Sequence, residues 1–481
     1  MTTDTAPDGR KRWLALVVLC GGVLMIVLDT TIVNVALPSI KADLGFGDAS
    51  LAWVVNAYML TFGGFLLLGG RLGDLYGHRR WFLGGLSLFT LASLACGIAT
   101  SQAMLVVARA VHGLGGAVVS AVALSLIMEL FQEPGERAKA MGVFGFVASG
   151  GGALGVLLGG VLASYDWHLI FLVNLPIGVA VFALVRALIA GGRGSATQGL
   201  DVAGAVTITA AMLLAVYAVI NGNDAGWTSR QTLGLLGLAA ILIAAFVRIE
   251  AKARNPLMPL GVLKRRNIAT ANVVAVLWAA AMFAWFFLSA LYMQLVLGYS
   301  PLQIGLAFLP ANIIMAVLSI GVSARLVMRF GVRAPLGAGL GLAALGLALF
   351  SVAPVNGELF VHVLPGMLLL GVGAGIAFNP LLLAAMSEVS PQESGLASGL
   401  VNTAFMMGGA LGLAVLASLA ASRTASLAAA GDALPAALTG GYHAAFVGGA
   451  IFAALAGLLG AALLRGAPHP HPHALKAAEP T

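Results

Sequence analysis

Long apolar runs follow one another along the chain, separated by short polar segments. An α-helix needs about twenty predominantly apolar residues to cross a bilayer, and runs that meet this test begin near residues 13, 51, 81, 103, 140, 169, 201, 231, 268, 302, 335, 360, 396 and 443. The pattern predicts an all-α integral membrane protein with fourteen transmembrane helices. The first run follows the basic residues 10–12 and is too long for a signal-peptide core, so it predicts a retained first helix.

Composition agrees with a lipid environment. Charged residues make up 9% of the chain and hydrophobic residues 60%, with a mean hydropathy of +1.01, whereas a soluble protein carries about 25% charged residues. No polar segment is long enough to bury a core of its own, which excludes a soluble catalytic domain. The net charge of +7 does not indicate nucleic-acid binding, because the basic residues lie in short clusters between apolar runs.

The distribution of Lys and Arg predicts the orientation of the helices. With the N-terminus inside, all of the 25 basic residues fall in inside segments except Lys41, Arg230, Arg423 and the intramembrane Arg109. This asymmetry is the one that the positive-inside rule describes. We therefore expect a multi-pass protein of the plasma membrane with both termini in the cytoplasm.

An internal repeat indicates two halves. GRLGDLYGHR at 70–79 resembles ARLVMRFGVR at 324–333, and the copies are eight predicted helices apart, which preserves their orientation. Two parallel-repeat six-helix bundles plus two inserted helices fit this spacing. The predicted segments are a cytoplasmic tail, an N-terminal bundle, the inserted helices, a basic linker, a C-terminal bundle and a disordered cytoplasmic tail, at 1–12, 13–190, 191–250, 251–267, 268–465 and 466–481.

Seven stretches, in order along the chain, carry a resemblance to a known family. They are LDTTIVNVALP from Leu28, WVVNAYML from Trp53, GRLGDLYGHRR from Gly70, RAVHGLGGA from Arg109, FLVNLPIG from Phe171, SPLQIGLAFLP from Ser300 and GLASGLVNTAFMMGGALG from Gly395. The sequence resembles the fourteen-helix drug:proton antiporters of the major facilitator superfamily over nearly its whole length. The resemblance implies multidrug or antibiotic efflux by alternating access, driven by a proton gradient without a cofactor.

Some residues depart from the family pattern. Val156 replaces a proline that is usual in the glycine-rich fifth helix, and His112 stands where a glutamine is common. Leu75 takes a place often held by arginine, and His168 and Leu169 interrupt the usual aromatic and arginine pattern. These departures concern gating and ion coupling rather than the fold.

Two charged residues, Asp29 and Arg109, lie well inside predicted spans. A charge near the bilayer centre costs about 2.5 to 3.5 kcal/mol on insertion scales, and both residues lie roughly 10 to 14 Å below the outer surface at 1.5 Å per residue. In one interpretation Asp29 carries the coupled proton, with Arg109 as its conditional partner and His112 as a relay. In the other, the two charges form a permanent pair that fixes helix packing, and His112 is a polar core residue.

The basic segment between the second and third predicted helices is a candidate gate. A carboxylate in so basic a loop can cap a helix N-terminus or pair with an arginine, and loss of that contact would accompany opening to the cytoplasm. The alternative is a simple positive-inside anchor. The candidate gating residues are Gly70, Arg71, Asp74, Gly77, Arg79 and Arg80.

Glycines recur every four residues in the fifth predicted helix, at Gly151, Gly155 and Gly159, with Gly160 beside them. Such a stripe permits close contact between helices, either as plain packing or so that this helix can rock against the facing half. A substrate cavity should be mostly apolar, with aromatic faces and a few hydrogen-bonding groups. Its candidates are Asn34, Trp53, Asn56, Tyr58, Trp285, Tyr292, Gln294, Asn379 and Asn402.

Other function classes fit less well. An ATP-driven pump needs a phosphate-binding loop ending in Gly-Lys-Ser or Gly-Lys-Thr, and a membrane enzyme needs clustered Asp, Glu or His; the sequence has neither pattern. The PHPHPH tail at 468–473 is better explained by disorder than by metal binding. A proton-coupled transporter of one natural product, lipid or nutrient, including an uptake system, is the alternative. We expect a monomer whose partners are hydrophobic small molecules, protons and the bilayer, without nucleic acid.

Overall fold

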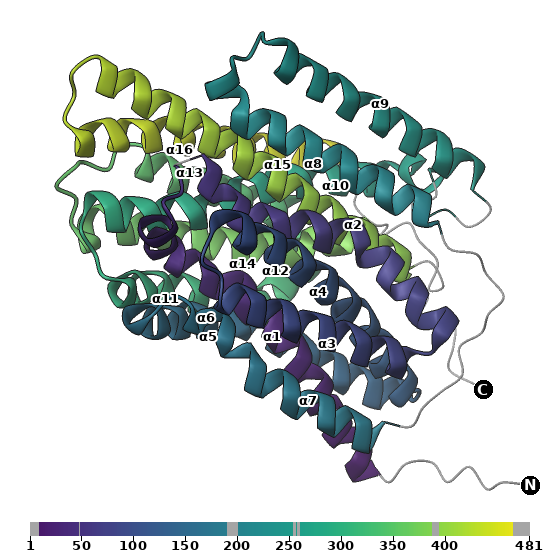
Figure 1. The fold of residues 1–481 in the computed structure, drawn as a ribbon. Coiled ribbons are helices and arrows are strands. Elements are labelled where there is room, and N and C mark those ends of the chain that lie inside the picture. Colours follow the sequence, from purple (N-terminus) through teal and green to yellow (C-terminus); the bar gives the residue numbers. More distant parts are fainter. Residues whose placement is uncertain are drawn as a thin grey trace, which may run out of the picture.

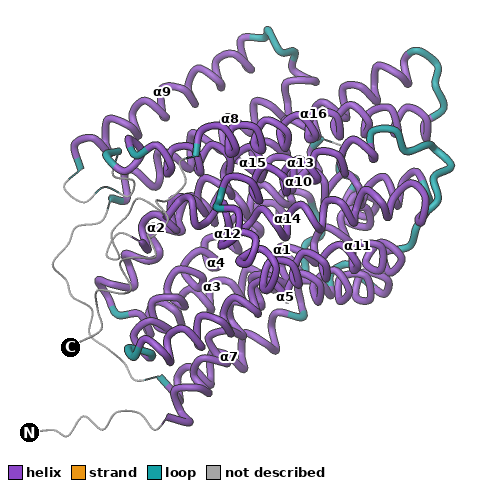
Figure 2. Tube along the Cα trace, turned by 180° about the vertical axis from the view of Figure 1, so that it is seen from behind, coloured by secondary structure: helices purple, strands orange, loops and turns teal. Residues whose placement is uncertain are grey.

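The computed structural model describes residues 9–47, 49–189, 201–253, 256, 260–386 and 394–464, and these residues are helical apart from short connections (Figure 2). The first part of the chain forms α1 (Gly9–Leu44), α2 (Trp53–Tyr76), α3 (His78–Gly97), α4 (Gln102–Leu130), α5 (Pro134–Tyr165), α6 (Leu169–Leu172) and α7 (Asn174–Leu188). Two further helices follow, α8 (Val202–Ala225) and α9 (Arg230–Lys252). The rest forms α10 (Arg266–Leu291), α11 (Pro301–Val317), α12 (Ser323–Phe330), α13 (Arg333–Phe350), α14 (Leu364–Met386), α15 (Ser394–Ala429) and α16 (Leu434–Leu463).

The all-helical membrane class is confirmed, whereas the number of spans is only partly supported. Among the described residues, 12 helices are long and apolar enough to cross a membrane. The fifth and tenth predicted spans appear as shorter apolar helices, Gly151–Tyr165 and Pro301–Val317. The tenth is short because its helix passes through a π-helical turn, Leu318–Val322, before continuing as α12.

Helix α1 begins at Gly9, so residues 9–12 of the predicted cytoplasmic tail are helical. Long straight-chain residues such as Lys and Arg are good helix formers, and they extend the helix beyond the apolar run. Arg12 Nη1 also lies 3.0 Å from Glu136 Oε2 of α5, which ties this first turn to its neighbour. The predicted tail at 466–481 lies outside the described residues.

The two copies of the internal repeat have the same local structure. Gly77 separates α2 from α3 at φ 95°, and Gly331 separates α12 from α13 at φ 72°. An L side chain rarely adopts this left-handed conformation, so glycine allows a reversal between two helices with almost no loop. The predicted loop over 70–80 is therefore wrong: it is helical on both sides of Gly77.

Helices 1–7 and 10–16 pack as two groups. In the first, α4 packs on α2 and α3, and α1 packs on α5; in the second, α10 packs on α15 and α16, and α13 packs on α14. The groups meet where α5 touches α11, α2 touches α15 and α1 touches α10. The helix α9 lies at the edge of the bundle beside α8, with a large share of its surface uncovered by the protein (Figure 1).

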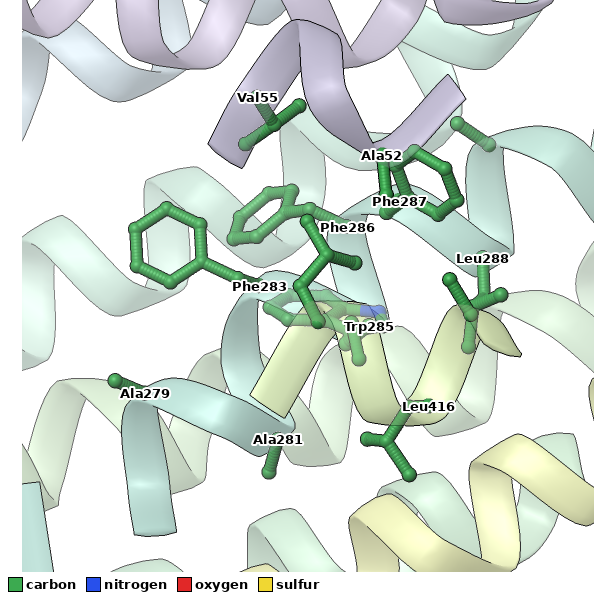
Figure 3. Packing of buried hydrophobic residues seen from close by; sticks show 14 of the residues in the cluster. Ala52, Val55, Ala279, Ala281, Phe283, Trp285, Phe286, Phe287, Leu288 and Leu416 are labelled. Atoms are coloured by element: carbon green, nitrogen blue, oxygen red, sulfur yellow. The ribbon is translucent and has the colours of Figure 1, made fainter. Parts of the chain in front are cut away.

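One apolar core is shared by both groups. It joins the C-terminal half of α1 and the start of α2 to α10, α11 and α14. Figure 3 shows Phe286 and Phe287 of α10 directed towards Ala52, in the turn just before α2, and Val55, in the first turn of α2. A second core has its buried members between Ala15 and Ile189 only. The two groups therefore pack on each other around the later half of α1, whereas its first half packs within its own group.

Candidate functional site

Asp29 and Arg109 meet in the interior of the first helix group. Arg109 Nη1 donates a hydrogen bond to Asp29 Oδ2 at 2.6 Å, and the side chains are 1% and 0% exposed. The residues come from α1 and α4, whose contact brings two widely separated parts of the sequence together. The pair is net neutral, which reduces the cost of burying either charge alone.

Backbone and aromatic groups hold the guanidinium in place. Arg109 Nε donates to the carbonyl oxygen of Val54 at 2.9 Å, in the first turn of α2. Its Cζ lies 4.4 Å from the ring centroid of Tyr58 and 5.7 Å from that of Phe171. A planar guanidinium can donate in its plane and stack on rings at the same time, so its orientation is fixed from three helices.

His112 is the third polar residue of this cluster. Its Nδ1 lies 3.2 Å from Arg109 Nη1 and 3.5 Å from Asp29 Oδ1, and the side chain is fully buried. The ring packs against Phe89 at 3.9 Å and against the edge of Tyr58 at 5.6 Å between centroids. Nδ1 of His112 therefore lies beside both a hydrogen-bond donor of Arg109 and a carboxylate oxygen of Asp29.

Three buried polar atoms in the cluster make no hydrogen bond: Asp29 Oδ1, His112 Nε2 and Tyr58 Oη. Buried polar atoms are almost always bonded, and exceptions are frequent where chemistry occurs. While Oδ2 of Asp29 is bound by Arg109, Oδ1 of the same carboxylate therefore has no hydrogen-bond partner.

The candidate gating segment is only partly described. Arg79 donates through Nη2 to the carbonyl oxygen of Arg186 at the end of α7, at 2.8 Å, and Arg80 is exposed. His78, which the sequence analysis did not single out, has Nδ1 2.6 Å from Glu129 Oε1 of α4. The side chain of Asp74, on which the gating interpretation depends, lies outside the described part of the structure.

The glycines of α5 pack closely, but not as the rocking hypothesis requires. A Cβ on Gly155 would overlap Thr31 Oγ1 of α1, and one on Gly159 would lie 3.0 Å from the carbonyl oxygen of Ile32. Gly151 likewise faces α1. The stripe therefore contacts the same helix group, because residues spaced by four share one face of a helix, and the hypothesis that it faces the other half is wrong.

Gly160 lies on a different face of α5 and does contact the other group. A Cβ there would lie 3.0 Å from the carbonyl oxygen of Pro301 and 3.1 Å from Leu302 Cα. The backbones of α5 and α11 are also close one turn away along both helices, since a Cβ on Gly305 would lie 2.6 Å from the carbonyl oxygen of Val156. Close backbone contact thus joins α5 to α11, next to the valine that departs from the family pattern.

Five of the nine cavity candidates, Trp285 among them, are buried in the packed interior. Tyr58 belongs to the Asp29 cluster, and the hydroxyl of Tyr292 donates to the carbonyl oxygen of Pro354 at 2.6 Å. Asn34 donates Nδ2 to Thr30 at 2.9 Å. Asn56 is fully buried in α2, and neither of its amide atoms has a hydrogen-bond partner. For Tyr292 the position indicates packing rather than substrate binding.

Trp285 and the other four candidates are more widely distributed. Trp285 is buried against Phe286 and Phe308, with its Nε1 unbonded, whereas Trp53 faces Tyr217 of α8 at 6.4 Å. Gln294 and Asn379 are half-buried and Asn402 is exposed, and Gln294 Oε1 is a buried atom without a hydrogen-bond partner. The nine candidates therefore do not form one site.

Comparison with known proteins identifies the family. The profile of the Major Facilitator Superfamily matches residues 19–413. The chain belongs to the major facilitator superfamily. It is accordingly a membrane transporter and not an enzyme.

Curated relatives of this superfamily member are similar over most of their length. The puromycin resistance protein pur8 of Streptomyces alboniger is 39% identical over 421 residues, which cover 87% of this chain and 83% of the relative. The cephamycin export protein CmcT of Amycolatopsis lactamdurans is 40% identical over 415 residues, 85% of each chain. The multidrug resistance protein Stp of Mycobacterium tuberculosis is 38% identical over 414 residues, 86% of this chain and 76% of Stp.

Solved structures of the superfamily share the fold. A bacterial homologue of the human lysosomal transporter Spinster, inward-facing and unoccupied, has a TM-score of 0.68 at 16% identity and covers 94% of this chain and 97% of its own. The inward-open xylose transporter XylE from E. coli has a TM-score of 0.64 at 14% identity, covering 97% and 99%. At these identities the likeness concerns the fold alone.

Proposed function

We propose that this superfamily member exports hydrophobic small molecules from the cytoplasm in exchange for protons. The observation that carries the proposal is the buried cluster of Asp29, Arg109 and His112, where one carboxylate oxygen and one ring nitrogen are unbonded. Relatives named for resistance to or export of puromycin, cephamycin and tetracenomycin C support the outward direction. The proton gradient supplies the energy, so the proposal requires no cofactor.

The proposed topology has fourteen spans, with both termini in the cytoplasm of a plasma-membrane protein that works as a monomer. The twelve candidate spans and the two shorter apolar helices support this number, and the positive-inside distribution supports the orientation. Two six-helix bundles would then be separated by the inserted helices α8 and α9. The positive φ at aligned glycines of the repeat supports equivalent halves.

The proposed cycle links the ion pair to the conformation. With Asp29 ionised, Arg109 Nη1 holds Oδ2 and the helices α1 and α4 stay together. A proton that enters from outside binds the unbonded Oδ1, weakens the attraction to Arg109, and permits the change to the inward-facing state. Release of the proton to the cytoplasm restores the pair. His112 Nδ1 lies beside Oδ1, where it can accept a hydrogen bond from the protonated carboxyl.

Gating by the segment Gly70 to Arg80 remains part of the proposal. Arg79 ties the α2–α3 turn to the end of α7, so a movement of this turn changes contacts at one end of the bundle. If Asp74 acts as a latch, Asp74→Asn should slow transport without changing the amount of folded protein. Normal transport by this variant would exclude the gating role.

The test of coupling uses purified protein in liposomes with an imposed inward proton gradient. Internal pH is followed on adding ethidium and then uncharged antibiotics, for the wild type and for Asp29→Asn. Proton movement on addition of a compound, absent in the variant, supports antiport and names a substrate class. Absence of movement with every compound, in protein shown to be folded, would contradict the proposal and favour uptake or another coupling ion.

A further inference from the structure

The two helix groups meet along two seams that the internal repeat makes equivalent. Gly77 follows α2, and its counterpart Gly331 follows α12, which continues α11 through a π-helical turn. Helix α2 therefore corresponds to α11, and α5 corresponds to α15, three helices later in each copy. One seam lies where α2 meets α15, and the other where α5 meets α11. Each seam thus joins the same two kinds of helix.

The two seams differ in what covers them. No residue of α2 from Trp53 to Gly73 is exposed. Its counterpart α11 exposes Leu302, Leu306 and Ile313 on one face, and α5 exposes Leu158. Helix α8 packs on both α2 and α15, and α9 packs on the outside of α8 (Figure 1). The inserted helices therefore cover the seam between α2 and α15, whereas apolar residues open to lipid border the seam between α5 and α11.

A set of hydrogen bonds fixes α8 to α15. Asn223 Nδ2 donates to the carbonyl oxygen of Ser418 at 2.8 Å and to its Oγ at 2.9 Å. Ser418 Oγ donates in turn to the carbonyl oxygen of Val219 at 3.2 Å, and Trp227 Nε1 donates to Asn223 Oδ1 at 3.0 Å. Lipid offers no hydrogen bonds to replace these. We call Asn223 and Ser418 the clamp, because their bonds join α8 to the second helix group.

The contact between α8 and α2 is of another kind. Thr209 Oγ1 donates to the carbonyl oxygen of Ala205 in its own helix at 2.7 Å. Its side chain lies against Gly64 of α2, where an added Cβ would overlap it. Nearby, Leu68 of α2 packs on Ala205 in a small apolar cluster. Small residues let two helices approach closely, and apolar contacts have no preferred direction, so α2 can slide along α8.

From these contacts we infer that α8 and α9 form a cover that moves with the second helix group and closes the seam between α2 and α15 to lipid throughout the transport cycle. The inference rests on the proposed function, since it assumes that the groups separate and close in turn. Hydrophobic compounds concentrate in the bilayer. They then exchange between lipid and the protein interior only across the seam between α5 and α11. The inserted helices thus restrict a fold with two equivalent seams to one lateral route.

Labelling from within the bilayer tests the cover on the full-length protein in liposomes. The probe is a lipid-soluble aryl diazirine, whose carbene reacts on illumination with residues that lipid reaches, and mass spectrometry locates the label. We expect label on α5 and α11 but not on residues 53–73 of α2, both at rest and under an inward proton gradient with ethidium. Label on α2 in the folded wild type equal to that on α11 would overturn the inference.

Removal of the clamp gives the complementary result. Asn223→Leu combined with Ser418→Ala removes three hydrogen bonds between α8 and α15, so label on α2 should rise about tenfold above background. Asn221→Leu is the matched control, because it removes a bond to the Tyr217 carbonyl within α8 itself, and it should leave α2 unlabelled. A folded protein without the clamp that gains no label on α2 would contradict the inference.

Cross-linking tests which group carries the cover. Val219→Cys with Ser418→Cys joins α8 to α15, and Ala205→Cys with Leu68→Cys joins α8 to α2; a short bifunctional thiol reagent bridges each pair. Transport should survive the first bridge and be lost with the second. Any other pattern would show that α8 does not move with the second group. A wild type that moves no protons contradicts the proposed antiport instead, and the labelling of α2 at rest, with and without the clamp, still decides whether α8 covers the seam.

Discussion

At the scale of single residues, the proposed coupling depends on how Arg109 is held. Its guanidinium bonds Asp29 through Nη1 and the Val54 carbonyl through Nε, and lies on the face of Tyr58. A lysine carries the same charge but has one ammonium group and no planar face. Charge alone therefore does not account for the arrangement, and charge and geometry can be separated by mutation.

We expect Arg109→Lys to fold and to lose most of its transport activity, by about tenfold or more. Lysine can still neutralise Asp29, so the buried carboxylate is not left alone, but it cannot also reach Val54 and cover Tyr58. Arg109→Ala should instead lower the yield of folded protein, because loss of one partner of a buried pair costs about 3 to 5 kcal/mol. The measurement is drug-dependent proton flux per folded protein. An Arg109→Lys protein with wild-type flux would show that the charge is sufficient.

Asp166 provides a residue-scale prediction about pH, outside the spans. Its Oδ1 accepts a hydrogen bond from the backbone N–H of His168 at 3.0 Å and lies 2.7 Å from the ring Nδ1. These bonds, the backbone bond first, lower the pKa of Asp166 below its usual value. Because the folded pKa is the lower one, the carboxylate stabilises the fold above the unfolded pKa of about 3.9, and this contribution disappears as the pH falls through the folded pKa.

The corresponding experiment compares Tm for the wild type and Asp166→Asn across pH. We expect the variant to melt at lower temperature near neutral pH and the two curves to converge in strong acid. His168 also contacts the Ala99 carbonyl at 3.3 Å, so His168→Ala should show a similar loss. A difference between wild type and variant that does not depend on pH would mean that the hydrogen bonds of Asp166, rather than its charge, matter.

At the scale of elements, close packing of α5 depends on glycine on two faces. The face with Gly155 contacts α1, and the face with Gly160 contacts α11. The four-residue spacing predicts a small-residue contact, and the structure has one. The partner helix was not predictable from the stripe, because the sequence of α5 does not say which neighbour offers a matching surface. Thr31, beside Gly155, is part of that surface and carries no signal of its own.

Two glycine-to-alanine substitutions separate packing from helix propensity. Gly155→Ala would place a Cβ on Thr31 Oγ1, so we expect a loss of stability of about 1 to 3 kcal/mol. Gly341→Ala in α13 meets no heavy atom within 4 Å and should be neutral or gain about 0.5 to 1 kcal/mol from the better helix former. Unfolding of the purified proteins in denaturant gives both values. Equal effects of the two substitutions would mean that α5 does not pack closely on α1.

At the scale of the whole molecule, apolar periodicity and length predicted most helices, because a membrane span must satisfy its backbone internally and be apolar throughout. Asp29 and Arg109 lie at one depth in their predicted spans, and the structure has them in contact. Tyr58 was assigned to the substrate cavity because its ring and hydroxyl suit one, and only three-dimensional packing reveals that it covers the guanidinium.

Alternating access predicts that the contact between α5 and α11 opens and closes during transport. A Cβ on Gly160 would lie 3.1 Å from Leu302 Cα, so the two backbones approach closely and this contact is a place to introduce a pair of cysteines. We therefore expect the pair Gly160→Cys and Leu302→Cys to form a disulfide on oxidation and to lose transport, with recovery on reduction. The native Cys20 and Cys96 are buried, so they should not interfere.

A cross-link inside one helix group is the matched control for this experiment. Gly337 of α13 faces Ala461 of α16, with a Cβ–Cβ separation of 3.1 Å once a Cβ is added, and a disulfide between cysteines at these positions joins helices that would move together. Transport should survive oxidation in this pair and in each single-cysteine variant. If the protein bridged between positions 160 and 302 still transports, the contact between α5 and α11 does not need to open during the cycle. The separation of the two groups that alternating access requires would then not occur at this place.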